Sequence, residues 1–239
     1  MTRKFYEAQI KDVILQKSHI FLDKKHDRHT ILFEKGLDLN SCIADCLIFT
    51  ENKLIGIEIK TEFDTTRRLN KQLNSYSKVC DEVYVLCGDN HADKVEELLD
   101  KNGHKHVGVI GYEIYKDEAI VGVYRKPTKS PSKSVVTMYM SLMWKEELLN
   151  LAGAFKRQIS SLEEFGYSVA SADSRGATGI NGISVQSNVS KRMRKPDIAK
   201  YIVQRLGEQK ANSLLCNIYI SHKLHVEKQL KYYHFKEEL

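Results

Sequence analysis

The chain has 239 residues, of which 42% are hydrophobic and 28% charged, a balance that indicates a folded protein with one sizeable core and an appendage. No apolar run is long enough to cross a membrane, no signal peptide is recognisable, and five cysteines are too few for a disulfide framework. We therefore expect a cytoplasmic protein without a membrane partner. The net charge is +6, and residues 127–239 carry 17 Lys and Arg against 10 Asp and Glu. This surplus favours a C-terminal half that faces a polyanion.

An amphipathic helix is expected to open the chain, because Phe5, Ile10 and Ile14 lie close to helical spacing with polar residues between them. Three apolar segments of strand length follow, at residues 30–36, 42–50 and 53–60. The junction "TENK" between the last two is short, which predicts a hairpin. Cysteines in and beside these segments, at positions 42, 46, 80 and 87, are interpreted as small core residues.

A second helix is predicted from about Thr65 to Cys80, with Asp64 as its N-cap. The segments that complete this half are a strand at 82–88, a helix at 91–103 and strands at 106–113 and 119–126. A meander of antiparallel strands followed by strand-helix-strand units predicts an α/β fold, a mixed sheet with helices on both faces.

A segment rich in proline, serine and lysine then predicts a linker at residues 127–136, between a core at 1–126 and a mainly helical, basic domain at 137–239. In that second domain we expect a single helix over 137–158 with Trp144 on its apolar face, a loop or weak hairpin over the Gly- and Ser-rich 166–190, a helix over 195–207 and a final helix at 227–239.

Asp45 and Glu58 are separated by twelve residues, enough to finish one strand, turn and return along the next. In such a hairpin both carboxylates can project from one face of the sheet, and Lys60 lies one pleat beyond Glu58 on that face. Two close acids repel unless a cation shares them, and a hard ion such as Mg2+ prefers carboxylate oxygens. The trio could activate a water molecule and stabilise charge on a phosphate, whereas the simpler alternative is a solvated edge strand.

The segments "ADCLIF" and "GIEIK" resemble the PD-(D/E)xK nuclease superfamily, in which a strand Asp and a Glu-x-Lys on the next strand form the metal and catalytic site. In "KQLNSY", Gln72 and Tyr76 are one helical turn apart, as in the RecB-like branch of that superfamily. The span from 43 to 86 is also similar to small bacterial and prophage proteins of this group. The resemblance implies a restriction-endonuclease-like fold for residues 1–126.

Carried over to this chain, the resemblance implies that Asp45 and Glu58 bind Mg2+ or Mn2+ and that Lys60 stabilises charge beside the attacking water. Gln72 and Tyr76 would contact the nucleic acid or support the site, and Glu34 would supply a further metal-binding carboxylate. The implied activity is hydrolysis of phosphodiester bonds, with DNA as the substrate and RNA as the alternative; a homodimer is left open. A non-catalytic accessory factor on the same fold, binding nucleic acid or protein, is the alternative function.

The helix expected over 195–207 is preceded by a group of cations, and with the Trp144 helix it resembles the two-helix SAP module that binds DNA. Cations at the start of a helix can approach phosphates without reading bases, which predicts salt-sensitive binding. The residues predicted to contact nucleic acid are Lys191, Arg192, Arg194 and Lys195. The alternative is a solvated basic face on a helical lid.

Overall fold

The computed structural model describes residues 7–23, 28–38, 41–61, 64, 66–116, 118–157, 169–170, 178–180, 183–185, 192–221 and 232–234. Its helices are α1 (Glu7–Gln16), α2 (Leu69–Val79), α3 (Ala92–Lys101), α4 (Val135–Leu142), α5 (Lys145–Arg157), α7 (Lys195–Leu206) and α8 (Glu208–Ser221). Its strands are β1 (His29–Leu37), β2 (Cys42–Thr50), β3 (Leu54–Lys60), β4 (Glu82–Gly88), β5 (Gly108–Tyr115), β6 (Glu118–Arg125), β7 (Val169–Ala170), β8 (Thr178–Ile180), β9 (Ile183–Val185) and β10 (Tyr232–His234).

Six of these strands, β1 to β6, form a mixed sheet in chain order, and β10 adds to the free side of β1. The β3–β4 and β4–β5 pairs are parallel, and each is joined by one helix, because a parallel connection must cross from one end of the sheet to the other. The other pairs in this sheet are antiparallel. The predicted α/β fold with a mixed sheet is therefore confirmed. Strand β3 is central, and all seven of its residues are buried, so it is not a solvated edge strand.

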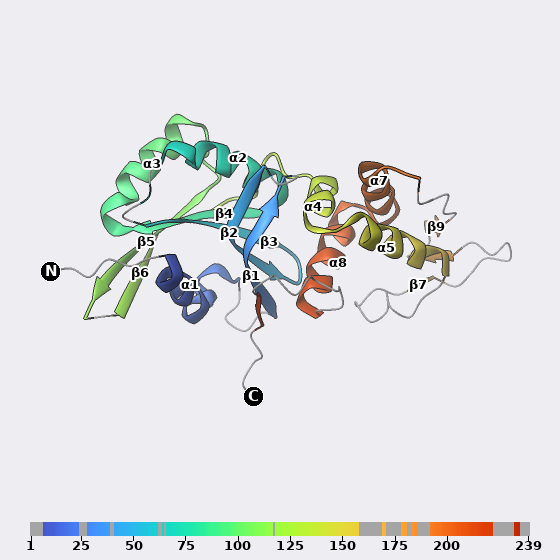
Figure 1. The fold of residues 1–239 in the computed structure, drawn as a ribbon, viewed down its shortest axis with the longest axis horizontal. Coiled ribbons are helices and arrows are strands. Elements are labelled where there is room, and N and C mark those ends of the chain that lie inside the picture. The colour runs from blue at the N-terminus through green and yellow to red at the C-terminus, as the bar shows by residue number, and fades with distance from the viewer. Residues whose placement is uncertain are drawn as a thin grey trace.

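Helices cover both faces of the sheet (Figure 1). On one face α1 buries its apolar side against isoleucines of β1, β2 and β3, including Ile48, Ile55 and Ile57. On the other face α2 packs over β2 and β3, the strands of Leu47 and Leu54, and α3 packs over β4 and β5. Both faces of the sheet carry apolar side chains because successive residues of each strand point to opposite faces. The face under α2 is also the one from which Glu58 and Lys60 emerge.

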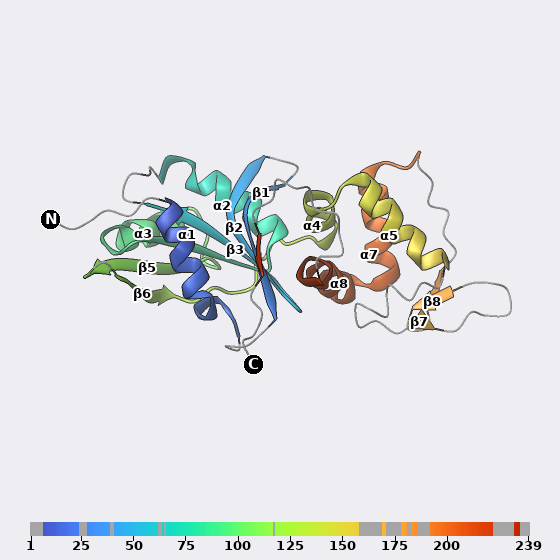
Figure 2. The same cartoon turned by 60° about the horizontal axis from the view of Figure 1, so that its bottom comes forward.

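The C-terminal helices α4, α5, α7 and α8 gather at one end of the sheet and share its hydrophobic core (Figure 2). Phe49 of β2 stacks on Tyr219 of α8, with ring centroids 4.3 Å apart. The hydroxyl of Tyr139 in α4 donates to the carbonyl of Ala211 in α8 at 2.8 Å. Residues 127–136 therefore lead into helices that continue the core of the sheet.

Two predicted helices differ from the structure. The single helix over 137–158 is wrong: it is divided at Met143–Trp144, where Met143 is extended and the Glu147 carboxylate accepts the Trp144 N–H at 2.5 Å. This bond satisfies a free backbone donor at the start of α5, as in half of a capping box, and leaves Trp144 58% exposed. The predicted cap at Asp64 is also wrong, because Asp64 accepts from the backbone N–H and hydroxyl of Thr61 and α2 begins only at Leu69.

Two further segments were misread or missed. Residues 232–234, expected within a final helix, form β10 beside β1, while the rest of 227–239 lies outside the described residues. Helix α8 was not predicted at all. Within 166–190 the described residues form a small antiparallel sheet in the order β7-β8-β9. Among the helices that the structure describes, none combines the length and apolar character needed to cross a membrane.

Candidate active site

The hairpin of β2 and β3 brings Asp45 and Glu58 together. It is closed by the Thr50 N–H, which donates to the Lys53 carbonyl at 3.0 Å, and it pairs residues in register up to Cys46 and Ile57. The next residues along the two strands are Asp45 and Glu58, which therefore lie across from each other. This geometry is the one that the spacing of the two acids predicted.

The register of β2 and β3 ends beside Asp45 and Glu58, and there Tyr76 of α2 supplies the hydrogen bonds that connect the two strands. Its hydroxyl accepts from the Asp45 N–H at 2.9 Å and donates to the Ile57 carbonyl at 3.2 Å, so that it bridges the two strands. Asp45 Oδ2 in turn accepts from the Ile59 N–H at 2.7 Å. Backbone groups that would otherwise be buried without partners are satisfied in this way. The tyrosine thereby fixes the separation of β2 and β3 beside the carboxylates.

Gly56 is what allows the ring of Tyr76 to lie against β3. A Cβ at position 56 would be 2.4 Å from Tyr76 Cδ1 and 2.8 Å from Cys80 Sγ, far inside ordinary contact. Only glycine leaves that space open. Sequence reasoning did not assign this residue to the site, although a glycine inside a buried apolar strand is a signal of close approach.

Lys60 and Gln72 complete the group. Lys60 Nζ lies 2.6 Å from Glu58 Oε1 and donates to Gln72 Oε1 at 3.2 Å, so its ammonium is held between a carboxylate and an amide. Glu58 is fully buried, and 11% of the Lys60 side chain is exposed. Asp45 and Gln72 are half-buried, which gives the group its access to solvent. All five residues predicted to be catalytic are therefore in one connected cluster.

The surroundings of Asp45 and Glu58 disfavour the charged form of both carboxylates. Burial, and then the charge of Glu58, raise the pKa of Asp45 to about 8, against the opposing effect of the Ile59 N–H and Lys60. Burial also raises the pKa of Glu58, and the ion pair with Lys60 opposes that shift. The Lys60 ammonium therefore does not fully offset the effect of burial on the pKa of the two acids. A further cation between them would add to its opposing effect.

The chemistry of these groups fits a hard divalent ion. Glu58 Oε2 is buried and has no hydrogen-bond partner among the described residues, so it is an acceptor that a cation would satisfy. In the described part of the chain, no three side chains of His, Cys, Asp or Glu converge on one point. An ion here would therefore be held by Asp45, Glu58, a backbone carbonyl and water, a set that suits Mg2+, which usually keeps several waters.

Glu34, predicted as a further metal ligand, is not brought into this group. It stands opposite Asp45 in the register of β1 and β2, but its φ of 57° is left-handed and its side chain is 61% exposed. Lys11 of α1 lies 2.7 Å from Glu34 and 2.8 Å from Glu7 and binds both carboxylates. The Lys11 ammonium therefore neutralises the negative charge that Glu34 would otherwise have offered to a metal ion.

The cations before α7 differ in how accessible their charge is. Arg192 is exposed, whereas Arg194 donates to Asp197 at 2.9 and 3.3 Å and so is partly neutralised. Burial lowers the pKa of the half-buried Lys195, although Glu147 acts against that shift. Lys191 lies outside the described residues. Phosphate binding by this segment stays a prediction.

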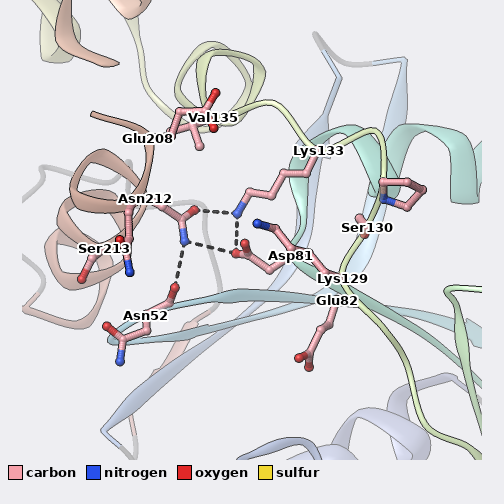
Figure 3. Close-up of a pocket in the computed structure, with 12 residues that line it drawn as sticks. Asn52, Asp81, Glu82, Lys129, Ser130, Lys133, Val135, Glu208, Asn212 and Ser213 are labelled. Carbon is pink, nitrogen blue, oxygen red and sulfur yellow. Dashed lines mark hydrogen bonds and ion pairs between the residues drawn. The ribbon is translucent and has the colours of Figure 1, made fainter. Parts of the chain in front are cut away.

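A second polar region lies where the sheet meets the C-terminal helices. A cleft of about 800 Å³ is lined there by residues of β4, the segment before α4, and α8 (Figure 3). Lys133 forms an ion pair with Asp81 and donates to Asn212 Oδ1 at 2.5 Å, while Asn212 Nδ2 donates to the Asn52 carbonyl at 2.8 Å. This network joins four parts of the chain and contains none of the predicted catalytic residues.

Comparison with known proteins gives one family. No curated protein and no solved structure matches the chain at a significant level. The family model described as "Bacteriophage P4 protein cII" matches residues 1–186, which include the whole β2–β3 hairpin, α2 and strands β1 to β6 of the sheet. Because this match covers more than half of the sequence, the chain belongs to the bacteriophage P4 protein cII family.

Proposed function

We propose that this protein is a metal-dependent nuclease of the PD-(D/E)xK type that hydrolyses phosphodiester bonds in DNA. The observation that carries the proposal is the convergence of Asp45, Glu58 and Lys60 on one sheet face, with Glu58 fully buried and one of its oxygens without a hydrogen-bond partner among the described residues. Such convergence is costly to build, since buried acids must be desolvated, and it serves no packing purpose.

Each residue has a role in the proposed reaction. Asp45 and Glu58 would hold Mg2+ or Mn2+, which supplies charge to activate water and to stabilise the phosphate during attack. Lys60 is fixed by Glu58 and Gln72, so its ammonium is oriented before substrate binds and can stabilise negative charge on a phosphate oxygen. Tyr76 is a positioning residue, because its hydroxyl bonds the backbone on both strands.

Two observations support a nucleic-acid substrate. Arg67, Arg68 and Lys71 are exposed at and before the start of α2, the helix that carries Gln72. Cations there can contact phosphates in any sequence, which would make binding weaken as salt is added. The family is named after a bacteriophage protein, which supports a role in phage biology. DNA is the proposed substrate, and RNA is the alternative to be compared.

The experiment is a cleavage assay with the purified full-length chain on supercoiled plasmid, linear duplex, single-stranded DNA and RNA, with Mg2+, Mn2+ or a chelator. We expect metal-dependent cutting that falls by about 10²–10⁴-fold in Glu58→Gln and in Lys60→Ala. Glu34→Gln is the matched control, because this acid is exposed and bonded to Lys11, and it should cut like the parent protein.

The outcomes separate the candidate functions. Cutting that persists in both site variants would show that a contaminant or another site is responsible, and it would refute the proposal. Salt-sensitive binding of DNA without cutting under any metal condition would instead identify a non-catalytic accessory factor. A loss of folding is excluded by comparing the thermal unfolding midpoints of the variants and the parent.

A further inference from the structure

The two edges of the large sheet differ in whether a further strand of the described chain covers them. On one side β10 pairs with β1 and covers that edge. On the other side β6 pairs only with β5, and no other strand in the described part of the chain adjoins it. Figures 1 and 2 show β5 and β6 extending away from the body of the protein, opposite the C-terminal helices. An uncovered edge presents a row of backbone donors and acceptors that can pair with another strand.

The exposed apolar side chains are concentrated at this edge. Six large hydrophobic residues are strongly exposed in the described structure, and four of them belong to β5 and β6. These are Tyr115 at 57%, Ile120 at 55%, Val123 at 46% and Tyr124 at 47%. Edge strands that must stay single usually carry charges or proline in their middle. Here the stretch from Ala119 to Tyr124 contains neither.

We propose that β6 is a dimerisation strand, which pairs antiparallel with β6 of a second copy of this chain. The charges at the ends of the strand select that partner. Glu118 begins β6 and Lys126 follows it directly, and both side chains are exposed. In a two-fold antiparallel pair, the start of one strand meets the end of the other, so each Glu118 approaches Lys126 of the partner subunit. Because the pair is symmetric, two equivalent attractions between Glu118 and Lys126 of the partner subunit form together.

The centre of the strand suits close pairing. A Cβ added at Gly122 would have no atom within 4 Å, so the middle of the edge is open. The pairing of β5 and β6 is regular from Glu118 to Val123 and shifts only between Val109 and Ile110. An antiparallel partner that sets Glu118 opposite Lys126 is centred on Gly122 and would therefore lie against Ile120 and Val123 of both copies.

The geometry also fixes the relation between the two copies. A two-fold axis that makes adjacent strands antiparallel stands normal to the sheet, so each face of one sheet continues into the same face of the other. The clusters around Asp45 and Glu58 would lie on the same side of one continuous sheet. Dimerisation itself does not depend on the proposed catalysis, because none of the five clustered residues belongs to β6.

The test is the molar mass of the full chain, measured by light scattering on a size-exclusion column over a series of concentrations. The parent should reach twice the mass of one 27.5 kDa chain. Ile120→Lys should be monomeric throughout the series, because it places a charge in the middle of the pair. Ile43→Lys is the matched control: Ile43 is 63% exposed, but it lies on β2, where it pairs with Gly36 of β1 and is far from β6 in the strand order.

Charge reversal identifies the partner as a second copy. Glu118→Lys and Lys126→Glu should each raise the dimer dissociation constant by about tenfold, whereas the double variant should restore it, since the attraction then runs in the opposite sense. A parent that is monomeric at every concentration would overturn the proposal, as would a dimer that survives Ile120→Lys. Variants must keep the parent's circular dichroism spectrum, so that loss of the dimer is not loss of the fold.

Discussion

Tyr76→Phe isolates what one hydroxyl contributes to this fold. The residue is fully buried, and its hydroxyl satisfies the Asp45 N–H and the Ile57 carbonyl, one on each strand. Phenylalanine keeps the ring and its packing against Gly56 and removes the hydroxyl together with those two bonds. A buried polar group left without a partner costs about 1–3 kcal/mol, so two such groups should lower the free energy of unfolding by about 2–6 kcal/mol. That is a large part of the total for a domain of ordinary stability, about 5–15 kcal/mol.

Two measurements check this value. Urea denaturation should give a lower midpoint at an unchanged slope, since the surface exposed on unfolding is the same. Amide hydrogen exchange should accelerate more at Asp45, whose N–H loses its acceptor, than at other amides. Tyr124→Phe is the control, because the Tyr124 hydroxyl also donates a hydrogen bond, to the Asp89 carboxylate, but at the surface. If Tyr76→Phe unfolds at the parent's midpoint with the Asp45 amide equally protected, the bridging role of the hydroxyl is wrong.

Three other perturbations have defined outcomes. Gly56→Ala forces a methyl group against the buried ring of Tyr76 and should cost about 1–3 kcal/mol in urea denaturation; a parent-like midpoint would show that the ring is free to move. Lys133→Ala leaves Asp81 without its buried cation and should cost about 3–5 kcal/mol; a loss no larger than that from an exposed lysine would contradict the network. His104 is buried, which lowers its pKa, so the unfolded chain takes up the proton more readily. The contribution of His104 to thermal stability should therefore be constant above about pH 6.5 and fall below it, so the loss of stability on acidification below that pH should be smaller in His104→Gln.

The part of the site that the sequence predicted is the part set by local periodicity. Alternation along β3 was enough to expect Glu58 and Lys60 on one face, and hairpin spacing was enough to expect Asp45 opposite them. Helical spacing brought Gln72 and Tyr76 to the same side of α2. Each of these inferences depends on residues close in sequence, and the structure gathers all five side chains.

Other features depended on contacts that periodicity does not encode. Glu34 sits at the right position across from Asp45, yet a left-handed φ and an ion pair with Lys11 of α1 direct it elsewhere. The division between α4 and α5 depends on how Glu147 folds back onto the Trp144 N–H. Helix α8 is a different case, because Ala211, Leu214, Leu215 and Ile218 already lie at helical spacing and could have been recognised.

A functional site differs from a solvated strand in whether its charged side chains have been removed from water, which is energetically costly. A solvated strand leaves its acids in water, where their charge costs nothing to keep. Here Glu58 is removed from water completely, and its carboxylate retains one ammonium partner and one oxygen without a hydrogen bond among the described residues. Replacing a buried ion pair by apolar groups is often neutral or stabilising, so stability alone would not preserve this arrangement. The arrangement is understandable if a cation and a phosphate are brought to it.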